Sequence, residues 1–260
     1  MSTSKEMGTG IGRELTAVRF VLGDDGVAHV TLNRPESANS RNQQMRDELG
    51  FVYDFVAAAP NVAVLVLTGA GDRFFCAGMD LKETIEGETS EQRRDRLRSS
   101  RDIDALATLP VPTIAAINGY ALGGGLEMAL ACDLRIVADD AQMGLPELRH
   151  GLVPGGGGTQ RLPRLIGSAR TLEMLYLSLH VDGPRAVELG IANRSVPRAE
   201  LAGATQEIAT LIAAQPREAT RAAKALVLAS AQTSLAEGLA LELEVLLELL
   251  EARSSTDRPH

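Results

Sequence analysis

Residues 113–127 read TIAAINGYALGGGLE, a continuous apolar run followed by glycines, a further apolar residue and a glutamate. The run Thr113–Ile117 predicts a buried strand, and Gly119–Gly125 predicts a tight turn into a helix that continues through Cys132. Backbone N–H groups in the first turn of a helix lack internal partners and favour negative charge. The stretch therefore predicts a strand–turn–helix unit whose glycines let a ligand approach the backbone closely.

Apolar runs and helical periodicities alternate on both sides of this stretch. Apolar residues predict further strands at Val27–Leu32, Ala63–Thr68 and Leu134–Ala138. Helical spacing predicts helices at Asn42–Ala59 and Ile103–Leu109. Alternation of strands and helices at this pace predicts an α/β fold with a largely parallel, helix-covered sheet.

The character of the sequence changes in two other regions. Residues 83–100 are strongly charged and predict an exposed, mobile loop and helix. Beyond Val196, alanine, leucine and glutamate dominate and the strand patterns end. We therefore predict a flexible leader at 1–14, a core at 15–195 and a helical C-terminal region at 196–260. Its apolar stretch Leu235–Leu250 requires a partner surface, either the core or another subunit.

Composition narrows the class of protein. The chain has 260 residues, a net charge of -8, 3% aromatic residues and no tryptophan, which disfavours a general nucleic-acid binder. The four histidines lack metal-ligand spacing, so no metal site is expected. Cys76 and Cys132 have small or apolar neighbours and are expected to be buried, reduced thiols. The opening residues lack the apolar core of a signal peptide, so we expect a cytoplasmic protein.

Two glutamates, Glu127 and Glu147, follow or precede glycine-rich segments and are candidates for proton transfer. Alone, Glu127 is compatible with an ordinary carboxylate at a helix start, and Glu147 with a surface loop acid. The apolar neighbours of Glu147 predict a pKa raised by desolvation. Two carboxyl groups beside exposed backbone amides suit addition, elimination or isomerisation next to a carbonyl.

Two other glycine-containing segments suggest nucleotide sites only weakly. Gly69-Ala70-Gly71 lacks the third glycine of a dinucleotide fingerprint, and no Lys-Ser/Thr pair follows Gly155–Gly158. A nucleoside triphosphate site is therefore not expected.

Several long motifs in a fixed order resemble the crotonase (enoyl-CoA hydratase/isomerase) superfamily, over about residues 18–251. The motifs are Asn33-Arg34-Pro35-Glu36, TGAGDRFFCAGMDLKE at 68–83, AINGYALGGGLE at 116–127, CDLR at 132–135, GLPE at 144–147, GLVP at 151–154 and GTQRLPR at 158–164. This resemblance implies a spiral core of ββα repeats and a helical C-terminal trimerisation region. It also implies an acyl-coenzyme A thioester substrate, no metal or redox cofactor, and a homotrimer or a dimer of trimers.

The resemblance also implies roles for individual residues. The N–H groups of Met79 and Gly124 would form an oxyanion hole, Glu147 would donate a proton to the α carbon, and Glu127, with Glu147, would activate water. Implied substrate or CoA contacts are Ala38, Ser40, Ala77, Asp80, Leu81, Lys82, Tyr120, Gly123, Pro146 and Gly155. The chain departs from the family pattern at Met79, which replaces a common alanine. Another departure is Ser37–Arg41, which stands where Lys-Arg-Asn-Ala-Leu is frequent.

Three functions compete at this point. The first is an enoyl-CoA hydratase, or an enzyme that dehydrates a 3-hydroxyacyl-CoA in the reverse direction. This function requires both glutamates to face one water site. The second possible function is that of an isomerase, thioesterase or carbon–carbon hydrolase of the same family. Isomerases commonly need only one acid/base group. The third is a non-catalytic assembly or RNA-associated module, which the glutamate pair and the acidic net charge disfavour.

Overall fold

The central feature of the fold is a six-stranded sheet with the strand order β1-β2-β3-β5-β7-β10. The computed structural model describes residues 12–83, 87–99 and 102–256, so most of the predicted leader lies outside the described residues. β1 and β2 are antiparallel, and every later pair is parallel. The strands are β1 (Val18–Leu22), β2 (Val27–Leu32), β3 (Val64–Gly69), β5 (Thr113–Ile117), β7 (Leu134–Ala138) and β10 (Arg194–Val196).

Most of these strands have the predicted positions. β2, β5 and β7 have the predicted bounds, and β3 begins and ends one residue later than predicted. Every residue of β5 is buried, as a central parallel strand requires. The antiparallel β1 was not predicted, because its apolar and exposed residues alternate over only five positions.

A second, four-stranded sheet has the order β4-β6-β8-β9 and was not predicted. Its strands are β4 (Phe74–Cys76), β6 (Tyr120–Leu122), β8 (Met143–Gly144) and β9 (His180–Val181). The predicted turn at Gly119–Gly125 is therefore wrong in part, because Tyr120–Leu122 pairs with β4 and β8. Strands of two or three residues carry no periodicity of their own and depend on these partners.

The second sheet places three loops at one edge. β4, β6 and β8 are parallel, so their carboxyl ends point the same way. The segments that leave these ends contain Gly78 and Met79, Gly123 and Gly124, and Pro146 and Glu147. The carboxyl edge of a parallel sheet is where ligands commonly bind in α/β proteins.

The helices nearest this edge begin where the sequence predicts. Asn42 caps α1 (Gln43–Ala58), because its Oδ1 accepts from the Met45 N–H at 3.0 Å. α4 (Gly124–Ala131) follows the glycine turn and is buried from Gly125 to Ala131. The remaining helices of the core are α2 (Ser90–Ser99), α3 (Asp102–Ala107), α5 (Gly158–Ile166), α6 (Ser168–Tyr176), α7 (Gly183–Leu189) and the 3-10 turns η1 (Pro35–Ser37), η2 (Glu147–His150) and η3 (Arg198–Glu200).

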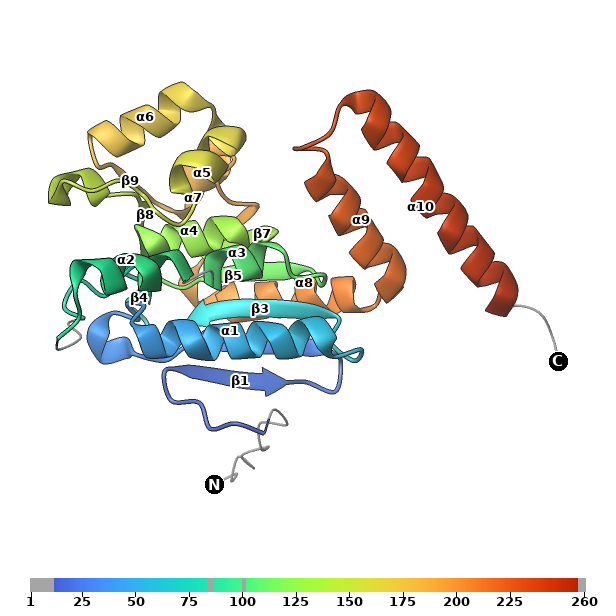
Figure 1. The fold of residues 1–260 in the computed structure, drawn as a ribbon, viewed down its shortest axis with the longest axis horizontal. Helices are drawn as coiled ribbons and strands as arrows, with labels where there is room; N and C mark the ends of the chain where they lie inside the picture. Colours follow the sequence, from blue (N-terminus) through green and yellow to red (C-terminus); the bar gives the residue numbers. More distant parts are fainter. Residues whose placement is uncertain (1–11, 84–86, 100–101, 257–260) are drawn as a thin grey trace.

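The C-terminal region is helical, as predicted. α8 (Leu201–Ala213) packs against β2, β3, β5 and β7. α9 (Arg217–Ala229) and α10 (Leu235–Thr256) lie side by side and project from the core (Figure 1). Among the described residues, no helix is long and apolar enough to cross a bilayer.

The surface of α10 is unusually apolar for a helix that projects from its own core. It exposes a row of leucines: Leu235, Leu239, Leu243, Leu246 and Leu250. Such a face requires a covering surface. Trimerisation through it stays a prediction, as does the division into three parts.

Both cysteines, Cys76 and Cys132, are free and buried, as predicted. Burial raises the pKa of the Cys76 thiol to about 11 and that of Cys132 to about 12. Neither thiol is therefore an activated nucleophile at neutral pH.

Candidate active site

A cavity of about 420 Å³ opens at the carboxyl edge of β4, β6 and β8. The loops after these three strands form one wall, and Gly155–Gly157 and the start of α3 form another. Exposed apolar side chains of Leu81, Leu152 and Val153 line its outer part. The site therefore combines an apolar entrance with polar groups deeper inside, as small-molecule sites commonly do.

The backbone nitrogens of Met79 and Gly124 lie close together among the residues that line the cavity. Gly78 has a φ of +96°, and a Cβ on it would lie 3.0 Å from the Gly124 nitrogen. A Cβ on Gly124 would lie 3.5 Å from the Met79 nitrogen. Gly124 is the first residue of α4, so its N–H has no partner inside the helix. This geometry suits the stabilisation of a negatively charged oxygen.

Glu127 is fixed in the first turn of α4, where the sequence predicts it. Its side chain is buried, and Oε1 accepts from the Gly156 N–H at 2.7 Å and from the Gly158 N–H at 2.8 Å. A Cβ on Gly156 would lie 2.7 Å from Oε2 of Glu127. The glycine run therefore serves as a clamp for this carboxylate, a role that the sequence did not indicate.

Glu147 lies at the start of η2, three residues after the end of β8. Its Oε2 is buried and has no hydrogen-bond partner among the described residues. Burial raises the pKa of Glu147 to about 7, and the negative charge of Glu127 adds to the rise, while a backbone hydrogen bond within Glu147 opposes it. The predicted desolvation is confirmed. Near neutral pH this carboxyl group can both hold and release a proton.

Gly123 lies next to both glutamates. Its C=O accepts from the Glu127 N–H at 3.0 Å, and a Cβ on it would lie 3.0 Å from Oε1 of Glu147. The φ of Gly123 is +53°, a left-handed value that favours glycine. The turn at Gly123 therefore lies against the Glu147 carboxyl group and leads directly into the first turn of α4, which contains Gly124 and Glu127.

A buried ion pair, Arg41 with Asp102, lines the cavity beside the two amides. Arg41 Nε lies 3.0 Å from Asp102 Oδ2, and Nη2 lies 2.7 Å from Oδ1. Only 10% of the Arg41 side chain and 2% of the Asp102 side chain are exposed. The sequence indicated Arg41 only as a departure from the family pattern and gave no signal for Asp102.

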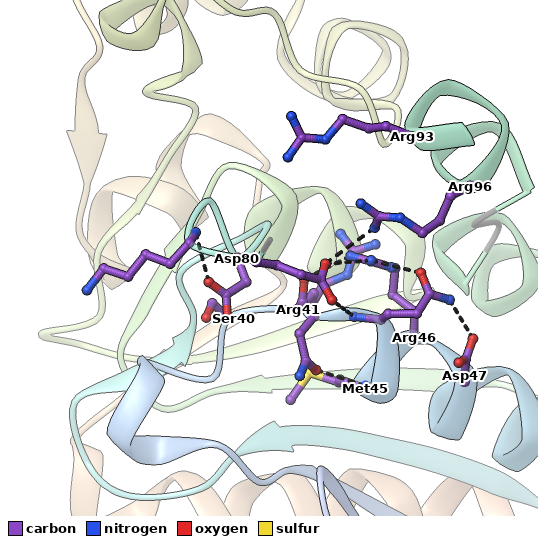
Figure 2. Close-up of polar contacts among 12 residues, drawn as sticks. Ser40, Arg41, Met45, Arg46, Asp47, Asp80, Arg93 and Arg96 are labelled. Atoms are coloured by element: carbon purple, nitrogen blue, oxygen red, sulfur yellow. Dashed lines mark hydrogen bonds and ion pairs between the residues drawn. The ribbon is translucent and has the colours of Figure 1, made fainter. Parts of the chain in front are cut away.

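A chain of charged groups connects α2 to the start of α1 (Figure 2). Glu83 Oε2 lies 2.9 Å from Arg46 Nη2 and 3.4 Å from Arg96 Nη1. Arg96 in turn binds Glu88, with 2.6 Å between Nε and Oε1. Figure 2 shows Arg96 extending from α2 toward the region of Arg41 and Arg46. The charged segment predicted at residues 83–100 therefore contacts the rim of the site.

The structure brings most of the predicted site residues together. The cavity is lined by both glutamates and both amide residues, and by Ala77, Leu81, Gly123, Pro146 and Gly155. Five predicted substrate or CoA contacts do not line it: Ala38, Ser40, Asp80, Lys82 and Tyr120.

These five residues lie on neighbouring segments. Arg34 Nη1 donates to the Ser40 carbonyl at 2.6 Å and to Asp80 Oδ2 at 3.0 Å. The Lys82 N–H donates to Asp80 Oδ1 at 3.1 Å. The Ala38 carbonyl accepts from the Ala77 N–H at 3.0 Å, and the Tyr120 ring packs on Phe74 with 5.4 Å between centroids. Their predicted contacts with CoA stay predictions.

A profile of the family described as enoyl-CoA hydratase/isomerase matches residues 23–257. The chain belongs to the enoyl-CoA hydratase/isomerase, or crotonase, family. A short-chain-enoyl-CoA hydratase of Clostridium acetobutylicum is 35% identical over 238 residues, 91% of each chain. An enoyl-CoA isomerase/hydratase of Mycosarcoma maydis is 38% identical over 244 residues, 89% of each chain. A carnitinyl-CoA dehydratase of Proteus mirabilis is 40% identical over 212 residues, 82% of this chain and 80% of the relative.

Solved structures share the crotonase fold. An enoyl-CoA hydratase from Bacillus anthracis superposes with a TM-score of 0.85 at 38% identity, covering 94% of this chain and 98% of the other. A Thermobifida fusca structure in complex with CoA superposes with a TM-score of 0.84 at 31% identity, covering 92% of this chain and 95% of the other. The predicted fold class is therefore confirmed.

Proposed function

We propose that this crotonase-family chain is an enoyl-CoA hydratase, which adds water reversibly to a 2-enoyl-CoA and gives a 3-hydroxyacyl-CoA. The observation that carries the proposal is the placement of two differently held glutamates in one cavity with the amides of Met79 and Gly124. Hydration requires one group that accepts a proton from water and one that donates a proton to carbon. A pair of carboxyl groups in unlike environments can divide these tasks.

In this mechanism the thioester oxygen binds between the N–H groups of Met79 and Gly124. Clamped by the Gly156 and Gly158 amides, Glu127 accepts a proton from water as the water oxygen bonds to the β carbon. Negative charge then collects on the thioester oxygen, and the protonated Glu147 donates its proton to the α carbon. Proton exchange between the neighbouring carboxyl groups restores the starting state.

Three features support this proposal over the alternatives. An isomerase needs one acid/base group, whereas both glutamates line this cavity. Hydration requires a proton donor that regains its proton after each turnover at neutral pH, and the pKa of Glu147 near 7 matches this requirement. The relatives include a hydratase and a dehydratase, which catalyse addition and removal of water. A CoA thioester as substrate is also supported by the CoA in the Thermobifida fusca structure.

The test is hydration of crotonyl-CoA, followed as the loss of absorbance of the conjugated thioester. We expect activity in the wild type and a loss of about 10²-fold or more in kcat for Glu127→Gln and for Glu147→Gln. Glu173→Gln, an exposed exchange of the same type on α6, is the matched control. An inactive but folded wild type would refute the short-chain hydratase. Full hydration activity in Glu127→Gln would refute the role of Glu127 as the group that accepts a proton from water.

A further inference from the structure

Arg41 contacts both halves of the oxyanion hole through different atoms. Its backbone N–H donates to the Gly78 carbonyl at 2.7 Å, and its carbonyl accepts from the Asp80 N–H at 3.1 Å. Arg41 and Met79 thus form a parallel bridge. The C=O and the N–H of one trans peptide group point in opposite directions, so the bond from Arg41 to the Gly78 carbonyl leaves the Met79 N–H directed away from Arg41. The backbone of Arg41 therefore orients one of the two amides.

The side chain of Arg41 reaches the other half. Its Nη1 lies 2.8 Å from the place that a Cβ on Gly124 would occupy. Asp102 binds the opposite edge of the guanidinium, at Nε and Nη2. The nitrogen that Asp102 does not bind is therefore the one that lies beside Gly124, and Arg41 is among the residues that line the cavity.

The electrostatic consequence follows from this orientation. Asp102 pairs with the Nε and Nη2 edge of the Arg41 guanidinium. The opposite corner, at Nη1, presents positive charge toward the oxyanion hole. Arg41 is 8% exposed, so water and salt screen this charge weakly. A positive charge in a fixed position near the hole stabilises an oxyanion more than it stabilises a neutral carbonyl.

We propose that Arg41 is a positioning residue for the oxyanion hole, whose backbone orients the Met79 amide and whose guanidinium, held by Asp102, stabilises charge on the thioester oxygen. The inference rests on the proposed function, because it concerns the same site. It adds a cationic group to a hole that the family resemblance describes by two backbone amides alone. Arg41 acts from behind Gly124, so its effect is smaller than that of an amide bonded to the oxygen.

A purely structural role is the competing explanation. In that case the pair of Arg41 and Asp102 only joins the segment before α1 to α3, and its removal lowers stability without changing the polarisation of a bound thioester. A spectroscopic measurement separates the two roles. The absorbance of a conjugated aryl-enoyl-CoA thioester moves to longer wavelength when donors and positive charge polarise its carbonyl.

The experiment compares the wild type with two variants. Arg41→Leu combined with Asp102→Asn removes both charges, so no buried charge is left without its counter-ion. Arg41→Lys keeps the backbone contacts and the positive charge. Arg185→Leu combined with Glu188→Gln removes an exposed pair of 2.7 Å on α7 and is the matched control. Binding of the aryl-enoyl-CoA probe, its absorbance maximum, and kcat and KM for crotonyl-CoA are measured for each protein.

We expect the neutral double variant to bind the probe, to lose at least half of the wild-type red shift, and to lose about tenfold in kcat. That loss is below the roughly 10² to 10³ of a directly bonded donor. KM should change by no more than about twofold, and Arg41→Lys should retain more of the shift than the neutral variant. A full wild-type shift in the neutral variant would overturn the role of Arg41 and leave the hydratase proposal intact. A wild type that binds the probe without any shift of its absorbance maximum would overturn both the role of Arg41 and the hydratase proposal.

Discussion

Exchanging Glu147 for glutamine should stabilise the protein above neutral pH while it removes catalysis. Burial raises the pKa of the folded-state carboxyl group to about 7 from its ordinary 4.5. Below pH 4.5 the group is protonated in the folded and unfolded chains, so its pKa shift has no effect on stability. Between pH 4.5 and 7 the folded chain binds the proton more tightly, and stability falls as the pH rises. Above pH 7 the full cost of a buried carboxylate is present.

The magnitude follows from the difference in pKa. A difference of about 2.5 corresponds to about 3 kcal/mol, at 1.36 kcal/mol for each pH unit. The Glu147 side chain is only half-buried, so solvent reduces the expected effect to about 2 kcal/mol. Glutamine carries no titratable proton, and any cost of its amide in this place is the same at every pH.

Urea unfolding of the wild type and of Glu147→Gln at pH 5 and pH 8 measures this effect. The stability of the variant relative to the wild type should increase by roughly 1.5 kcal/mol between the two pH values, because part of the effect is already present at pH 5. Glu173→Gln, on the exposed face of α6, should show no comparable change. A difference between Glu147→Gln and wild type that stays constant from pH 5 to pH 8 would refute the raised pKa. In the wild type, kcat/KM should decline above about pH 7, because the proton donor is lost.

Two further substitutions test the clamp on Glu127 and the attachment of α9. Gly156→Ala places a Cβ 2.6 Å from Ile103 Cδ1 and 2.7 Å from Glu127 Oε2, so the Glu127 carboxylate is crowded and kcat for crotonyl-CoA should fall at least about tenfold. Gly50→Ala, whose Cβ meets no atom within 4 Å, is the control. Unchanged kcat in Gly156→Ala would contradict the expectation that the added methyl group displaces the Glu127 carboxylate. Lys224→Met removes a buried ammonium group whose Nζ lies 2.7 Å from Asp133 Oδ2. This loss should lower the free energy of unfolding, measured in urea, by about 2 kcal/mol and leave kcat unchanged. An unaltered urea midpoint would contradict this second expectation.

The long elements of the fold could be predicted because each carries its own pattern. β2, β5 and β7 are continuous apolar segments, and α1 has helical spacing with a capping asparagine at Asn42. The second sheet could not be predicted in this way. Its strands β6 and β8 have three and two residues, too few to show a period, and they exist because neighbouring segments pair with them.

The candidate site also contains parts that the sequence could predict and parts that it could not. Motif order identified Glu127, Glu147 and the two amides, because the resemblance covers the segments that contain them. The partners of these groups lie far away in the sequence. Gly156 donates to Glu127 across 29 positions, and Arg41 pairs with Asp102 across 61. No local pattern relates residues at such separations.

The amino-acid sequence by itself determined which chemical groups are available: two carboxyl groups, glycine-rich segments on either side of them, and apolar runs that must be buried. It also determined the family, through the order of its motifs. Only the tertiary structure decided what these groups can do. Three short parallel strands bring their carboxyl ends to one edge, so the amides and both glutamates line one cavity. Burial in that cavity, not the identity of the residue, brings the pKa of Glu147 to about 7, because desolvation depends on what surrounds a carboxyl group in space.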